Sequence, residues 1–355
     1  MTPETKNEPP SDKIRPPTRP KGWASGVVVG FLLLVAVILV VAKASEGRKF
    51  AELVQRAEPA WLLLALAYQV ATYFFAGGVW HIVLIRFGVK IPMRTLAVLG
   101  LAKLSIDKII PAAGIGGGVL LVRGLEKRGA PAPVASATLL MELLSTYAAR
   151  GISIGIALII LWANYGFQAA LVALVTAFAV ITLAISFLIL WLTRPDVRDL
   201  PAWAKRIPGF RSVLRYIVNT PPEVLRNRTL FSKAVLLQFA VILLDAATLD
   251  AVLRAIGQPT RLDFVFAGFA ISAAISTLSL IPGGLGAFEA VSVLMLRLLR
   301  VPIEAGLAAT LMLRAYTLWL PMIPGFFILR SETVDIIISQ NHLSERVGSA
   351  SEPPA

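Results

Sequence analysis

Pro282-Gly283-Gly284-Leu285-Gly286-Ala287-Phe288-Glu289 interrupts an apolar stretch that runs from residue 262 to residue 300. An α-helix cannot continue through this string, because proline lacks the donor N–H and each glycine disfavours the helix. The stretch therefore predicts two helices with a break between them. A second apolar stretch, residues 92–124, breaks in the same way at Pro111-Ala112-Ala113-Gly114-Ile115-Gly116-Gly117-Gly118.

The composition around these breaks is that of a membrane protein. Of the 355 residues, 57% are hydrophobic and 15% are charged, whereas soluble domains carry about 25% charged residues. The 34 Lys and Arg against 21 Asp and Glu give a net charge of +13, which is typical of cytoplasmic loops that face anionic headgroups. Nucleic-acid binding is the competing interpretation of a basic chain. The basic residues lie between apolar spans and not in one tract, so we expect no nucleic-acid partner.

Six apolar stretches have the length of about 20 residues that a helix needs to cross a bilayer. They are Trp23–Ala42, Trp61–Leu84, Val134–Trp162, Ala169–Leu192, Leu230–Leu253 and Leu307–Leu329. The first ends in a signal-peptidase-like Ala42-Lys43-Ala44, but its length favours an uncleaved anchor. Residues 1–21 are expected to be a disordered cytoplasmic tail, residues 22–330 a transmembrane domain and residues 331–355 a polar cytoplasmic tail.

The distribution of Lys and Arg supports a topology in which the broken segments do not cross the bilayer. Basic residues cluster in 86–130 and 194–233, and six spans place both clusters and both termini in the cytoplasm. The breaks also resemble each other: Ala137-Thr138-Leu139-Leu140-Met141 follows the first, and Ala309-Thr310-Leu311-Met312-Leu313 follows the second. An odd number of spans separates them, so the predicted fold is an all-α transmembrane bundle with two re-entrant, Pro/Gly-broken segments in an inverted repeat. Chance similarity between Gly- and Ala-rich strings is the alternative.

Ionisable residues inside apolar spans are costly and usually face a polar interior or a partner. The candidates are Lys103, Asp107, Lys108, Glu142, Arg150, Asp245, Asp250, Glu289 and Arg314. Glu142 and Arg314 occupy equivalent places after the two breaks, and we expect them to approach each other. This pair would either orient a ligand or pin two helices together. Asp245 could carry protons, but a hydrogen bond to a neighbouring helix is the favoured interpretation.

The helix that follows each break begins with free N–H groups, which can hold a phosphate or carboxylate. A phospholipid headgroup is therefore the predicted ligand. The predicted binding residues are Pro111, Gly114, Gly116, Glu142, Pro282, Gly283, Gly284, Gly286, Glu289 and Arg314. For Glu289, the simpler alternative is that an acid in the first turn stabilises its own helix.

Several kinds of chemistry have no residues to support them in this sequence. The chain contains no cysteine and two histidines, His81 and His342, which excludes thiol catalysis and argues against a histidine metal site. It also has no phosphate-binding nucleotide loop and no paired acidic metal motif. We therefore expect no catalytic residues, no metal and no cofactor.

The two breaks and their flanking residues resemble the lysylphosphatidylglycerol synthase transmembrane-region family, the flippase-like membrane domain of the multiple peptide resistance factor. The second motif is matched by Ile281 to Glu289 and by Arg314; the first is matched by Pro111 to Gly117, Arg123, Arg128-Gly129 and Met141-Glu142-Leu143-Leu144. The resemblance covers roughly residues 25–330. One arginine of the family phrase "ERLLD" is missing, because Leu143 follows Glu142 directly.

The resemblance implies a protein of the bacterial inner membrane that moves phospholipids between leaflets. In the resistance factors a cytosolic aminoacyl-transferase domain follows the membrane domain. Here about 25 mostly polar residues follow the last span, so lysyltransferase activity is not expected. The alternatives are a membrane-embedded lipid-modifying transferase and a non-catalytic partner of an envelope or lipid biosynthesis enzyme. Membrane phospholipids are the expected partners; a second copy of the chain or a lipid-biosynthesis enzyme is left open.

Overall fold

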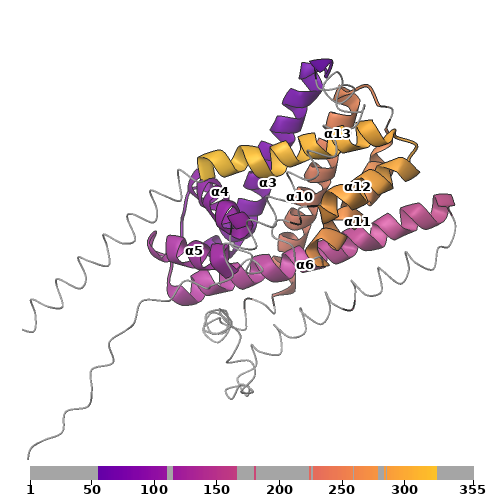
Figure 1. Ribbon diagram of the computed structural model, residues 1–355. Coiled ribbons are helices and arrows are strands. Elements are labelled where there is room, and N and C mark those ends of the chain that lie inside the picture. The colour runs from indigo at the N-terminus through magenta and orange to yellow at the C-terminus, as the bar shows by residue number, and fades with distance from the viewer. Residues whose placement is uncertain are drawn as a thin grey trace, which may run out of the picture.

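The protein is described by a computed structural model that covers residues 55–109, 115–165, 180, 224, 227–258, 260–278, 284 and 286–325 (Figure 1). This part of the chain is helical. Its helices are α3 (Pro59–Arg86), α4 (Met93–Ile109), α5 (Ile115–Glu126), α6 (Ala132–Tyr165), α10 (Arg228–Ala255), α11 (Leu262–Leu278), α12 (Ala287–Leu298) and α13 (Ile303–Arg314). The helix α13 continues into a π-helical turn, η3 (Ala315–Trp319).

Four helices in the described ranges are long and apolar enough to cross a membrane: Pro59–Arg86, Ala132–Asn164, Arg228–Ala255 and Ile303–Gly325. Each coincides with a predicted span, and the bounds differ by a few residues. The predicted spans Trp23–Ala42 and Ala169–Leu192 lie outside the described residues, as do both predicted tails. The structure thus confirms an all-α, multi-span protein.

The described helices fall into two units whose first three helices have the same lengths. We call α3 to α6 the first unit and α10 to η3 the second unit. The helices α3 and α10 each have 28 residues, α4 and α11 each have 17, and α5 and α12 each have 12. The packing repeats as well: in each unit the first helix contacts the second and fourth, and the third contacts its neighbours on either side.

The first helix of each unit also ends in the same way. The N–H of Val89 donates to the carbonyl of Leu84 (3.0 Å) after α3, and the N–H of Gln258 donates to the carbonyl of Leu253 (2.9 Å) after α10. A glycine with positive φ precedes each donor. This is the Schellman C-cap, in which a left-handed residue lets the chain turn back onto the last helical carbonyls.

The helices α3 and α10 lie side by side and run antiparallel. The N–H of Glu58 donates to the carbonyl of Ala255 (2.9 Å) at one end. Gln69 Nε2 donates to Thr248 Oγ1 (3.0 Å) further along, and Gly78 faces the Leu237 side chain near the other end. Two helices that hold the same place in their units therefore point in opposite directions.

The fourth helices of the two units lie on opposite sides of this central pair. Figure 1 shows α6 along one edge and α13 along the other, with α3 and α10 between them. Each fourth helix reaches the other unit: α6 packs against α10 and α11, and the backbone at Gly325 lies against Ser105 and the Leu101 carbonyl of α4.

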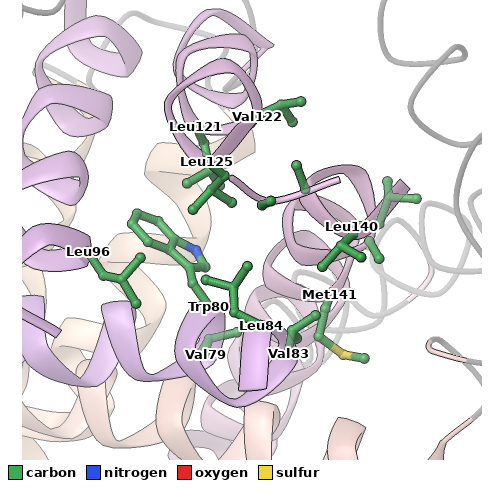
Figure 2. Packing of buried hydrophobic residues seen from close by; sticks show 14 of the residues in the cluster. Val79, Trp80, Val83, Leu84, Leu96, Leu121, Val122, Leu125, Leu140 and Met141 are labelled. Carbon is green, nitrogen blue, oxygen red and sulfur yellow. The ribbon is translucent and has the colours of Figure 1, made fainter. Parts of the chain in front are cut away.

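Each unit is centred on an apolar cluster, and each cluster also takes in a few residues of the other unit. In the first unit Trp80, 2% exposed, is surrounded by side chains from four helices (Figure 2). The members labelled there are Val79, Trp80, Val83, Leu84, Leu96, Leu121, Val122, Leu125, Leu140 and Met141. Phe266, Phe269 and Phe288 contribute to the second core. Because lipid is as apolar as leucine, such cores hold helices together by close packing and polar contacts more than by exclusion of water.

Candidate functional site

The second unit buries an ion pair between α12 and α13. Arg314 Nε donates to Glu289 Oε1 (2.7 Å), and the two residues are 8% and 4% exposed. A second guanidinium nitrogen of Arg314 donates to the carbonyl of Gly284 (3.3 Å), and the guanidinium carbon lies 4.2 Å from the centre of the Phe288 ring. Arg314 thus connects the last turn of α13 to the first turn of α12 through Glu289 and to the chain just before α12 through Gly284.

Glu289 has a second role at the start of α12. Its other carboxylate oxygen, Oε2, accepts from the backbone N–H of Gly286 (2.6 Å). The alternative expected for this residue, that it stabilises its own helix, is therefore correct, and the ion pair with Arg314 is additional. Each oxygen of the Glu289 carboxylate therefore accepts one hydrogen bond from within the second unit.

The first unit holds a three-residue charge cluster at the corresponding place. Lys103 Nζ lies 2.8 Å from Asp107 Oδ2 and 3.1 Å from Glu142 Oε1. The indole N–H of Trp80 donates to Glu142 Oε2 (2.9 Å), and the N–H of Gly117 donates to Asp107 Oδ1 (3.1 Å). The three charged side chains are 16–19% exposed. One cation here faces two acids, and four helices contribute to the cluster.

A glycine lies against the preceding helix at each break. A Cβ at Gly117 would overlap the Asp107 carboxylate, and a Cβ at Gly284 would overlap the Ser276 side chain. Asp107 and Ser276 are near the ends of α4 and α11. Only glycine allows the chain to return this close to the helix that it has just left.

The expected approach of Glu142 and Arg314 is wrong. Glu142 pairs with Lys103 and Arg314 pairs with Glu289, so each finds its counter-charge within its own unit. The reason is the position of the helices, because α3 and α10 separate α6 from α13 (Figure 1). Residues at equivalent positions of two oppositely directed units, such as Glu142 and Arg314, need not lie near each other.

Polar side chains on several helices also hydrogen-bond between the two units. Gln69 Nε2 donates to Asp245 Oδ1 (2.9 Å) as well as to Thr248, which confirms the hydrogen bond expected for Asp245. On α6, a guanidinium nitrogen of Arg150 donates to Thr277 Oγ1 of α11 (3.1 Å). Polar side chains within a bundle often hydrogen-bond across helices in this way.

The other predicted binding residues are only partly covered. Pro111, Gly114, Pro282 and Gly283 lie outside the described residues. Gly116 lies in the first turn of α5. Within the described ranges, no three His, Cys, Asp or Glu side chains gather as a metal site would require.

Comparison with known families gives one match that spans most of the chain. The family model of the lysylphosphatidylglycerol synthase TM region matches residues 27–325. The chain belongs to this family. No curated protein matches it. As a member of the lysylphosphatidylglycerol synthase TM-region family with four described apolar spans, it is a membrane-embedded, multi-pass protein.

In this family member, the sequence was enough to identify the charged residues of the site, but not the uncharged residues that hydrogen-bond to them. Lys103, Asp107, Glu142, Glu289 and Arg314 all stood out as charges in apolar segments. Trp80 and Gln69 did not, because a tryptophan and a single glutamine are ordinary in such helices. One feature of the sequence could have pointed to Gln69. Gln238 lies at the same distance from the start of α10 as Gln69 does from the start of α3.

Proposed function

We propose that the protein moves an anionic or lipid-linked phospholipid headgroup between the leaflets of the bilayer. The observation that carries this proposal is the pair of charge clusters, one partly buried and one buried, at equivalent breaks of two units. One contains Lys103, Asp107 and Glu142, and the other contains Glu289 and Arg314. Charged groups in apolar segments destabilise a bundle unless paired, and they usually mark a pathway for a polar substrate.

The arrangement of the units supports transport more than it supports fixed binding. We infer that they form an inverted repeat, because α3 and α10 are equivalent and antiparallel. In many transporters, inverted repeats surround a site near the membrane midplane, and movement of one repeat against the other exposes that site to each side in turn. Both units here carry a break followed by a charge-bearing helix, as such a mechanism needs.

The topology proposed for this function places the protein in the bacterial inner membrane with both termini in the cytoplasm. The support is the clustering of Lys and Arg in 86–130 and 194–233, which the positive-inside rule assigns to the cytoplasmic side. Fusing a reporter of cytoplasmic location to each terminus in turn tests this arrangement. Reporter activity at only one end would contradict it.

Reconstitution tests the transport itself. Purified protein is inserted into liposomes that contain a fluorescent phosphatidylglycerol, and a membrane-impermeant quencher reports the fraction of label in the outer leaflet over time. We expect the wild type to speed exchange over protein-free liposomes and Arg314→Ala to abolish the gain. Arg297→Gln, which removes an exposed cation at the end of α12, is the matched control and should behave as wild type. Exchange at the protein-free rate by the wild type would refute the proposal for this lipid class.

A further inference from the structure

Three cations in the described transmembrane helices differ in how their charge is compensated. Lys103 faces two carboxylates, and Arg314 pairs with Glu289. The hydrogen bond that Arg150 makes goes to the neutral hydroxyl of Thr277 (3.1 Å). In addition, Asp245 of α10 lies near enough to Arg150 to act on it electrostatically.

Arg150 lies where the two units meet. It is near the middle of the 34-residue α6 of the first unit, and its partner Thr277 is in the last turn of α11 of the second unit. The neighbouring Ser276 is packed against Gly284, whose carbonyl accepts from Arg314. Arg150 thus reaches the second break from the opposite unit.

The hydrogen bond that the described residues give Arg150 uses a small part of its donor capacity. A guanidinium has five N–H donors, and Thr277 accepts from one of them. The groups that act on Arg150 electrostatically are Tyr147 on its own helix and Asp245 on α10. Asp245 also accepts from Gln69. The side chain is partly exposed.

The starts of α5 and α12, which the sequence suggested as phosphate sites, are already in use by protein carboxylates. Asp107 accepts from the N–H of Gly117, and Glu289 accepts from the N–H of Gly286. A phosphate at either place would meet a carboxylate of the same sign. Of the three cations, Arg150 is the one whose described hydrogen bond goes to a neutral group and not to a carboxylate.

We propose that Arg150 binds the phosphate of the ligand, and that this phosphate belongs to a lipid headgroup. This inference rests on the proposed transport function, since it names the residue that would recognise the transported group. Arginine suits the role, because its planar fork of donors matches two oxygens of a phosphate. A merely structural tie between α6 and α11 needs only one hydrogen bond, which a neutral side chain can supply.

The test measures binding by the rise in unfolding temperature that a ligand produces. Detergent-solubilised wild type, Arg150→Gln, Arg150→Lys and the exposed control Arg297→Gln are each titrated with three probes. The probes are short-chain phosphatidylglycerol, the diacylglycerol with the same chains and no phosphate, and inorganic phosphate. For each variant, the apparent affinity of each probe is derived from the rise in unfolding temperature over the same variant without probe. A change in basal stability caused by the substitution therefore does not enter the comparison.

We expect the wild type and Arg297→Gln to bind phosphatidylglycerol more tightly than diacylglycerol. Arg150→Gln should weaken phosphatidylglycerol binding about tenfold or more, as loss of a charge-assisted pair implies, and should leave diacylglycerol binding unchanged. Arg150→Lys should retain part of the preference. Equal phosphatidylglycerol binding by wild type and Arg150→Gln would overturn the inference. Inorganic phosphate that binds as tightly as phosphatidylglycerol would overturn the assignment to a lipid.

The outcomes of this test and of the leaflet-exchange assay are distinguishable. A wild type that exchanges lipids while Arg150→Gln binds normally would refute only the role of Arg150. A wild type that binds phosphatidylglycerol through Arg150 but exchanges no lipid would refute only transport.

Discussion

Arg314 and Glu289 show how a full charge is kept inside an apolar bundle. Their ion pair is held by further contacts: the carboxylate also accepts from Gly286, and the guanidinium also contacts Gly284 and Phe288. Burial removes both charges from water, so the pair adds little net stability compared with an apolar replacement. Removing one partner is different, because the other then remains buried and uncompensated.

A double-mutant cycle at this ion pair separates the two effects. We expect Arg314→Met to lower the free energy of unfolding by about 3–5 kcal/mol, since Glu289 loses its counter-charge. Adding Glu289→Gln should restore much of that loss, because glutamine can still accept from the N–H of Gly286 without a buried charge. Unfolding in mixed micelles measures the stability of each variant. Additive losses in the double variant would contradict this account.

In the first unit the effect of a substitution on stability should depend on which charge is removed, because Lys103 is shared by two acids. Lys103→Met leaves Asp107 and Glu142 facing each other without a cation, and we expect a loss of about 3–5 kcal/mol. Glu142→Gln should lower stability by only about 1 kcal/mol, since Asp107 still compensates Lys103 and glutamine can still accept from Trp80. The same unfolding measurement compares the two. A larger loss for Glu142→Gln than for Lys103→Met would show that the charges are not distributed in this way.

At the scale of elements, the breaks bring each short helix against the helix before it. The start of α5 lies so close to the end of α4 that a methyl group at Gly117 would overlap the Asp107 carboxylate. We expect Gly117→Ala to lower stability by about 1–3 kcal/mol and to slow lipid exchange, because Asp107 must leave both Gly117 and Lys103.

Gly155 of α6 is the matched control for that substitution. A Cβ there would meet no atom within 4 Å, and alanine favours a helix over glycine by about 0.5–1 kcal/mol. Gly155→Ala should therefore leave stability unchanged or raise it. If both alanine variants behave alike, the close approach of α4 and α5 is not what makes Gly117 necessary.

The long helices were the elements most accessible to sequence reasoning. The predicted span Leu230–Leu253 corresponds to Arg228–Ala255, because a run of about 20 apolar residues has few alternatives in a bilayer. The helices on either side of each break were also predicted, because proline and glycine end helices by local chemistry. Such features depend on neighbouring residues and can be read without knowledge of the fold.

The partners of the charged residues depend on tertiary packing and were not accessible in the same way. The ion pair of Lys103 with Glu142 joins α4 to α6, and that of Arg314 with Glu289 joins α13 to α12. The expected pair of Glu142 and Arg314 relied on equivalence between the repeats. Equivalence gives the place of a residue within its unit but not which unit its side chain faces.

At the scale of the whole molecule, the contact between α3 and α10 is the natural axis for movement of one unit against the other. Contacts along it extend from Glu58 and Ala255 to Gly78 and Leu237, and Gln69 adds hydrogen bonds to Asp245 and Thr248. The parts of the fourth helices that pack against the opposite unit lie away from this central contact. If the units rock, this central contact should persist while the contact of Gly325 with α4 changes.

Disulfide cross-links test this movement, and the natural chain contains no cysteine to interfere. Ser105→Cys with Gly325→Cys would tie the last helix of the second unit to α4, where the two backbones approach closely. Glu58→Cys with Ala255→Cys would tie α3 to α10 at their hydrogen-bonded ends. In the variant with the first cysteine pair, we expect oxidation to stop lipid exchange and reduction to restore it. The variant with the second pair should exchange lipids in both the oxidised and the reduced state. If the oxidised variant with the first pair still exchanges lipids freely, the two units do not move apart at the contact between Gly325 and α4. Loss of exchange only in the second pair would place the moving contact between α3 and α10 instead.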